Sequence, residues 1–216
     1  MKPHQLIEDI IIFSIVVPII LGLIRYKRLE KGFLVFFWLL IYQLIYTCFS
    51  FIRLSPQLTH LFNHITELPD ALLIISVFFL FAHFSNIKKW LYYLGIVYCF
   101  LVVLEIFFLG VDSYRQSPTI ILFDIVKIIA GVFVANKILE EDKRSSLKTA
   151  KLLIVIPMIF YFTVYSYFTI LMAVLYKPET ALFFINLSNI TNRFELLVYF
   201  AYSIAFLCLP KKKIFL

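Results

Sequence analysis

Seven long apolar stretches, joined by short polar segments, account for almost all of this 216-residue chain. They cover residues 6–24, 33–52, 68–87, 90–109, 118–136, 152–176 and 183–209. About 20 apolar residues in a helix cross a hydrocarbon core of about 30 Å, so each stretch has the length of a membrane-spanning helix or nearly so. The sequence therefore predicts an all-α fold, a single bundle of seven transmembrane helices with no room left for a soluble domain.

The composition agrees with a multi-pass membrane protein. Hydrophobic residues make up 62% of the chain and charged residues 15%, whereas soluble domains have about 45–50% and about 25%. The net charge of +7 does not indicate nucleic-acid binding, because no basic soluble module is present to carry it. The three cysteines all lie inside predicted spans, so no disulfide framework is expected. The first stretch has no Ala-x-Ala cleavage site and is expected to remain as the first helix.

The basic residues alternate between the connecting segments. Cytoplasmic loops of membrane proteins are enriched in Lys and Arg. Here 14 of the 20 basic residues fall on one side of the predicted bundle and four on the other. The sequence therefore predicts seven crossings with the N-terminus outside and the C-terminus inside. The residues on the basic side are Arg25, Lys27, Arg28, Lys31, Lys88, Lys89, Lys137, Lys143, Arg144, Lys148, Lys151, Lys211, Lys212 and Lys213.

Charged and amide side chains inside the predicted spans gather in the outer half of the bundle. Such residues are costly in lipid and usually face the bundle interior or a water-filled cavity. Asp124 and Lys127 are spaced i,i+3, so they share a helix face and are expected to pair. The last stretch carries polar groups on two faces, which predicts a central position for that helix. The candidate ligand-binding residues are Asp70, Glu105, Asp124, Lys127, Asn189, Asn192, Arg193 and Glu195.

Further polar side-chain groups lie at a similar depth in the second and sixth stretches. They are the amide of Gln43 and the hydroxyl groups of Tyr46, Tyr161, Tyr165 and Tyr167. Together these groups predict a pocket open to the outside and bounded by the second, third, fifth, sixth and seventh helices. One alternative is a polar network that only fixes how the helices pack. A proton relay is another. The residue types alone do not separate these interpretations.

A pocket of this kind favours a membrane receptor, or an accessory subunit of a membrane complex, over an enzyme. A transporter of small solutes or ions stays open as an alternative, although the inner half of the bundle is apolar and offers no evident exit. An intramembrane enzyme is the third class, but no Gly-x-Ser-x-Gly or phosphate-binding glycine loop occurs. We expect no cofactor and no metal. His60 and His64 are spaced i,i+4, yet a metal there would need loop carboxylates as further ligands.

The expected partners follow from the layout. The bilayer surrounds the bundle, and a small ligand would enter from the outer side. A receptor without a soluble domain must pass its state to a membrane or cytoplasmic protein, and the polar inner segment 137–151 is the natural contact. Nucleic acid is not expected as a partner.

Two fragments resemble small seven-span inner-membrane proteins of Bacteroidota-type bacteria. They are residues 17–29 (VPIILGLIRYKRL) and residues 206–213 (FLCLPKKK). The resemblance covers the whole chain in layout. It implies a bacterial inner membrane, and it supplies no activity and no functional residues.

Overall fold

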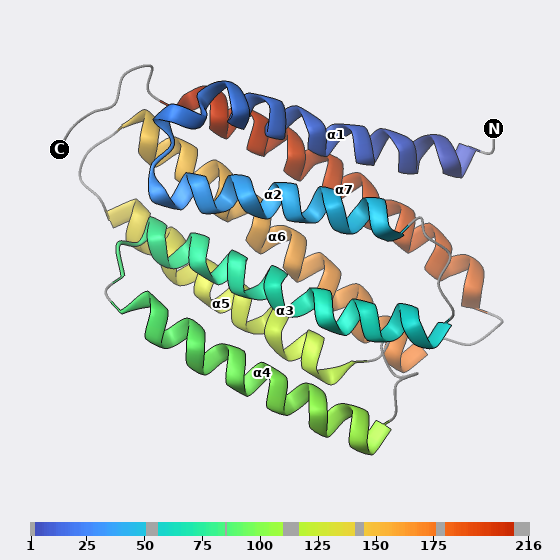
Figure 1. Cartoon of the computed structure of the whole chain (residues 1–216). Coiled ribbons are helices and arrows are strands. Elements are labelled where there is room, and N and C mark those ends of the chain that lie inside the picture. The colour runs from blue at the N-terminus through green and yellow to red at the C-terminus, as the bar shows by residue number, and fades with distance from the viewer. Residues whose placement is uncertain are drawn as a thin grey trace.

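The computed structural model describes residues 3–50, 56–84, 86–109, 117–140, 145–175 and 180–209, and over these ranges it is almost entirely helical. The long helices lie side by side and alternate in direction along the chain (Figure 1). The predicted all-α class is confirmed. The elements are α1 (Pro3–Arg25), the short 3-10 helix η1 (Tyr26–Arg28), α2 (Lys31–Ser50), α3 (Pro56–Phe81), α4 (Ile87–Leu109), α5 (Pro118–Glu140), α6 (Ser146–Leu175) and α7 (Ala181–Cys208).

Within the described ranges, four helices are long and apolar enough to cross a membrane by length and composition. These segments are Lys31–Phe49 in α2, Lys89–Phe108 in α4, Pro118–Glu140 in α5 and Ser146–Met172 in α6. The remaining long helices, α1, α3 and α7, pack directly against members of this group or against each other (Figure 1). The chain therefore has the apolar helices of a membrane-spanning protein.

Helix α3 begins well before the predicted third span. The hydropathy pattern predicts that this span starts at residue 68. The structure instead has one continuous helix from Pro56 to Phe81, with Pro69 inside it. Glu67 and Asp70 therefore share a face of α3 at i,i+3 spacing. This continuity places two carboxyl groups on the wall of a cavity, as described below.

The other end of α3 also differs from the prediction, which extends the span to residue 87. His83 has a φ of 52°, in the left-handed region that ends many helices. The N–H of Phe84 donates to the carbonyl of Phe79 at 3.0 Å, and the N–H of His83 donates to the carbonyl of Leu80 at 3.3 Å. These two bonds form a Schellman motif, which satisfies the last carbonyl groups of the helix.

Helices α1, α3, α5 and α7 finish at the same end of the bundle, which we call the basic end (Figure 1). The last carbonyl groups of a helix lack intrahelical donors and carry a partial negative charge. Three basic side chains from this end satisfy such groups. Arg25 donates to Leu209, Lys148 donates to Leu139 at 2.8 Å, and Lys151 donates to Phe81 at 3.2 Å. The basic residues therefore stabilise the helix ends.

Lys151 is expected to contribute much more to stability than Lys148. Lys151 is buried, and its Nζ also lies 3.4 Å from Nε2 of His83, whereas Lys148 is about half-exposed and its bond lies at the surface. Lys151→Met should lower the free energy of unfolding by about 1–3 kcal/mol, because it leaves a buried carbonyl group without its donor. Lys148→Met should cost only about 0.5 kcal/mol. Thermal unfolding in the same detergent compares the two, and equal losses would contradict this difference.

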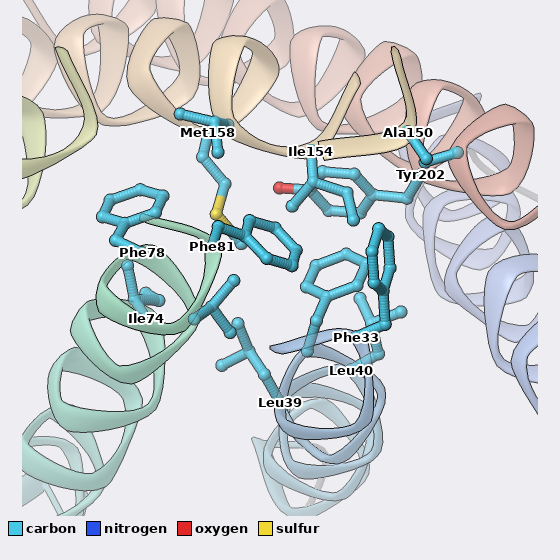
Figure 2. Packing of buried hydrophobic residues seen from close by; sticks show 14 of the residues in the cluster. Phe33, Leu39, Leu40, Ile74, Phe78, Phe81, Ala150, Ile154, Met158 and Tyr202 are labelled. Atoms are coloured by element: carbon cyan, nitrogen blue, oxygen red, sulfur yellow. The ribbon is translucent and has the colours of Figure 1, made fainter. Parts of the chain in front are cut away.

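An apolar core fills the half of the bundle next to the basic end. Aromatic rings of α2 and α3 pack against aliphatic side chains of α6 and against Tyr202 of α7 (Figure 2). The rings of Phe33 and Phe81 lie 4.9 Å apart between centroids, and Phe36 meets Tyr202 edge-on at 4.8 Å. Such aromatic pairs add about 0.5–1.5 kcal/mol each beyond area burial. The core closes this half of the bundle and leaves the polar groups to the other half.

Candidate ligand-binding site

A cavity of about 290 Å³ lies between α2, α3, α5, α6 and α7, in the half of the bundle away from the basic end. These are the five helices that the sequence predicts around a pocket. The volume is near the lower limit of about 300–1,000 Å³ for small-molecule pockets. Its charged wall residues are Glu67, Asp70, Asp124, Lys127 and Glu195, and its aromatic ones are Tyr42, Tyr46, Tyr161, Phe162, Tyr165, Tyr199 and Tyr202.

Lys127 is the centre of the charged wall. Its Nζ lies 2.6 Å from Oδ1 of Asp124 and 3.2 Å from Oε1 of Glu67. The same ammonium group lies over the ring of Phe162, 4.4 Å from the centroid. Lys127 and Asp124 are each only 1% exposed. The predicted pair of Asp124 and Lys127 is confirmed, and a buried cation is compensated by two carboxylates and an aromatic face.

Glu67 is the member of this cluster that sequence reasoning missed. It lies 60 positions from Lys127 in the chain, so no local spacing connects the two. The signal that was available is the spacing of Glu67 and Asp70 at i,i+3. This spacing places the two carboxyl groups on one helix face only because α3 continues through Pro69.

The α2–α3 side of the cavity is held by two hydrogen bonds between these helices. Nε2 of Gln43 donates to Oδ1 of Asp70 at 3.3 Å, and the hydroxyl of Tyr42 donates to the carbonyl oxygen of Thr66 at 2.6 Å. Asp70 was predicted as a site residue, and it lines the cavity. The Gln43 amide that donates to Asp70 carries no charge.

The α6–α7 side presents aromatic rings and one carboxyl group. The hydroxyl of Tyr199 donates to Oε1 of Glu195 at 2.7 Å, a contact that follows from their i,i+4 spacing on α7. Tyr161 and Tyr165 stack on each other along α6, with centroids 6.0 Å apart. Tyr202 extends the aromatic surface to the boundary with the apolar core (Figure 2).

One carboxylate oxygen in the cavity wall has no hydrogen-bond partner in the described part of the chain. It is Oδ2 of Asp124, whose other oxygen binds Lys127. The hydroxyl of Ser166 on α6 interacts with this carboxylate, but the two groups do not meet in good hydrogen-bond geometry. A buried acceptor without a donor costs about 1–3 kcal/mol. The wall of the cavity thus contains a buried acceptor whose hydrogen bonding is incomplete.

Glu105 does not belong to the cavity, although the sequence groups it with the site residues. Its Oε2 accepts hydrogen bonds from the hydroxyl of Ser117 at 2.8 Å and from the N–H of Thr119 at 3.1 Å. The Ser117 hydroxyl in turn accepts from the N–H of Ile120 at 3.2 Å. Ser117 is thus the N-cap of α5, and the Glu105 carboxylate joins α4 to this helix start. The Glu105 carboxylate therefore helps to cap the start of α5.

Two of the remaining candidates on α7 do not line the cavity. Asn189 is half-buried and Arg193 is exposed, and neither is among the wall residues. The side chain of Asn192 lies outside the described residues, as do those of His60 and His64. Tyr167 is 62% exposed on the outer surface of α6. Within the ranges that the structure describes, no group of three or more His, Cys, Asp and Glu side chains is arranged to hold a metal ion.

The cavity is polar, and the apolar core closes its side toward the basic end. Charged and hydrogen-bonding groups line its walls, while the described residues between it and the basic end belong mainly to the apolar core. Comparison with known proteins adds no relative: no family model, no curated protein and no solved structure matches this chain.

Proposed function

We propose that this protein is a seven-span receptor, or the ligand-sensing accessory subunit of a membrane complex, which binds a small molecule in the cavity around Lys127. The observation that carries the proposal is a polar cavity of about 290 Å³ within an otherwise apolar helical bundle. Charged groups at membrane depth are costly and typically serve a function. Packing alone would be achieved more simply by apolar side chains of similar volume.

The membrane arrangement in this proposal has seven crossings, with the N-terminus outside and the basic end in the cytoplasm. Each long helix has 20 to 30 residues, which at about 1.5 Å per residue reaches across a hydrocarbon core of about 30 Å. The concentration of Lys and Arg at one end supports the orientation through the positive-inside rule. In this orientation the cavity lies in the half of the bundle nearer the outside.

A receptor is favoured over a transporter because of the core beneath the cavity. Phe36, Phe206 and Tyr202 pack together there, with the Phe36 and Phe206 rings stacked 5.7 Å apart. A solute passing inward would have to separate these helices. Two alternative functions use the same cavity residues. A small-solute or ion transporter would also need a pathway through the bundle, and an intramembrane enzyme would need a catalytic pair.

The inner segment 137–151 is the proposed contact for a membrane or cytoplasmic partner. Its described part includes the half-buried or exposed residues Lys137, Ser145 and Lys148. Lys148 and Ser145 form the N-terminal turn of α6, where the Ser145 hydroxyl accepts from the N–H of Lys148 at 3.1 Å. A rigid helix start at the membrane surface, rich in charge, is a suitable docking point for another protein.

Purification from native membranes in a mild detergent tests the proposal, with mass spectrometry of the proteins and small molecules that stay bound. A retained small molecule, or a stoichiometric partner protein, is the expected result. Reconstitution into proteoliposomes then separates receptor from transporter. A receptor produces no uptake of the retained molecule, and uptake that Lys127→Met abolishes would replace the receptor proposal with the transporter one.

A further inference from the structure

The charges in the cavity wall do not balance. Four carboxyl side chains line it, from Glu67, Asp70, Asp124 and Glu195, whereas Lys127 is the sole Lys or Arg among the described wall residues. Arg193 lies only two positions from Glu195, but it is exposed and outside the wall. Among the described wall residues, carboxyl groups thus exceed ammonium groups by three.

The excess is not spread evenly over the cavity. Glu67 and Asp124 share Lys127 as their counter-charge. Asp70 and Glu195 instead receive hydrogen bonds from neutral donors, Gln43 and Tyr199. Both carboxyl side chains are half-buried, and Lys127 acts on Asp70 without forming an ion pair with it. A carboxylate withdrawn from water without an ion-pair partner is unfavourable unless a proton or a cation compensates it. The negative charge that lacks an ion-pair partner is therefore located at Asp70 and Glu195.

Tyrosine rings lie near both of these carboxyl groups. Tyr161 and Tyr202 each interact electrostatically with Asp70 and with Glu195, and both line the cavity. Aromatic faces attract ammonium groups by about 0.5–2 kcal/mol, the larger value applying where water is excluded. The position of Lys127 over Phe162 shows that this cavity already holds one ammonium group in this manner.

We propose that the ligand is a small organic cation, whose ammonium group binds between Asp70 and Glu195 against the rings of Tyr161 and Tyr202. This inference rests on the proposed function and names the class of its ligand. A second feature of the same wall is Oδ2 of Asp124, a buried acceptor that receives no hydrogen bond of good geometry in the described part of the chain. The volume of about 290 Å³ admits an amine with one ring.

A bare metal cation fits this cavity less well than an amine. Ca²⁺ takes six to eight oxygen ligands at about 2.3–2.6 Å, and Mg²⁺ requires near-octahedral geometry. No cluster of three suitable side chains occurs among the described residues. An organic cation needs only one or two carboxylates and an aromatic surface.

The test uses the full-length protein in lipid nanodiscs and three probes of one shape. Phenethylammonium is the cation, 2-phenylethanol the neutral analogue and phenylacetate the anion, with empty nanodiscs to correct for partition into lipid. Isothermal titration calorimetry should give an affinity for phenethylammonium about tenfold or more above that for the alcohol. Phenylacetate should show no binding, because the carboxyl groups repel it.

Glu195→Gln is the matched variant, because the amide keeps an oxygen to accept from Tyr199 and loses the charge. It should weaken phenethylammonium binding by about tenfold to a hundredfold, the range for a hydrogen bond to a charged group. Glu140→Gln, at an exposed position on α5, should bind as the unaltered protein does. If Glu195→Gln does not fold, as judged by its thermal unfolding, Asp70→Asn takes its place.

The outcomes separate this inference from the proposed function. Equal affinities for the amine and the alcohol would mean that protons balance Asp70 and Glu195, and this overturns the cation proposal. Preferential binding of phenylacetate would also overturn it, while leaving the cavity as a ligand site centred on Lys127. If none of the three probes binds at millimolar concentration, the cation proposal is rejected, and native co-purification alone decides whether the receptor proposal stands.

Discussion

Lys127→Met should lower the free energy of unfolding by about 3–5 kcal/mol, the cost of breaking a buried ion pair by removing one partner. The substitution retains most of the side-chain volume and removes the charge. Asp124, at 1% exposure, would then lie buried with no cation beside it, and Glu67 would lose the same partner. No other Lys or Arg among the described cavity residues is available to replace it.

The measurement is thermal unfolding in detergent, followed by intrinsic fluorescence, with Lys89→Met as the control. Lys89 is exposed near the start of α4, so its loss should change stability by about 0.5 kcal/mol at most. Adding Asp124→Asn and Glu67→Gln to Lys127→Met should recover at least half of the loss, because the uncompensated charges are then gone. A Lys127→Met protein as stable as Lys89→Met would show that the buried cluster does not form.

Gly131→Ala should destabilise the bundle by about 1–3 kcal/mol, the usual cost of overpacking a tight contact. A Cβ at this position of α5 would lie 2.6 Å from Cγ1 of Ile159 on α6 and 3.3 Å from Cε2 of Phe78 on α3. Cγ1 is bonded directly to the Cβ of Ile159, and β-branching restricts the χ1 angle of this residue. The atom therefore cannot move aside unless the whole side chain moves. The two helices would have to separate.

Gly95→Ala is the control for this second prediction, since it makes the same chemical change in another long helix. A Cβ on Gly95 would meet only Cδ1 of Leu72, at an ordinary 3.9 Å. This variant should be as stable as the unaltered protein or gain up to about 1 kcal/mol, because alanine favours a helix more than glycine does. A loss of stability at Gly95 as large as that at Gly131 would show that helix contacts are not the cause.

The two glycines also show where sequence reasoning about helix packing is limited. The sequence contains no Gly-x-x-x-Gly pair, which argues against close packing through that motif. The structure nevertheless uses single glycines at Gly22, Gly32 and Gly131 for close helix contacts. A lone glycine has no pattern that marks it, because the large side chain that fills its space comes from another helix.

The site was predictable to the extent that its geometry is local. Asp124 and Lys127 pair because three residues along a helix return the chain to the same face. The i,i+4 spacing of Glu195 and Tyr199 leads to their hydrogen bond in the same way. The helices around the cavity also followed from polar positions within each apolar stretch.

Long-range partners were not predictable by these means. Glu67 reaches Lys127 across 60 residues, and Glu105 binds the start of α5 instead of the cavity. Lys151 was expected in a connecting loop, but it is buried in α6 with its ammonium group on the end of α3. Each of these contacts depends on how one helix is rotated toward its neighbour.

The sequence by itself determined the all-α class, the positions of the apolar helices along the chain and the basic end of the bundle. These properties depend on composition and on a period of 3.6 residues, both of which are local. Only the tertiary structure decided that Glu67, Asp70, Asp124, Lys127 and Glu195 share one cavity and that Arg193 lies outside it. The physical reason is that the rotation and spacing of the helices are set by interlocking Phe, Ile and Gly contacts between distant segments, and these specify which polar faces meet.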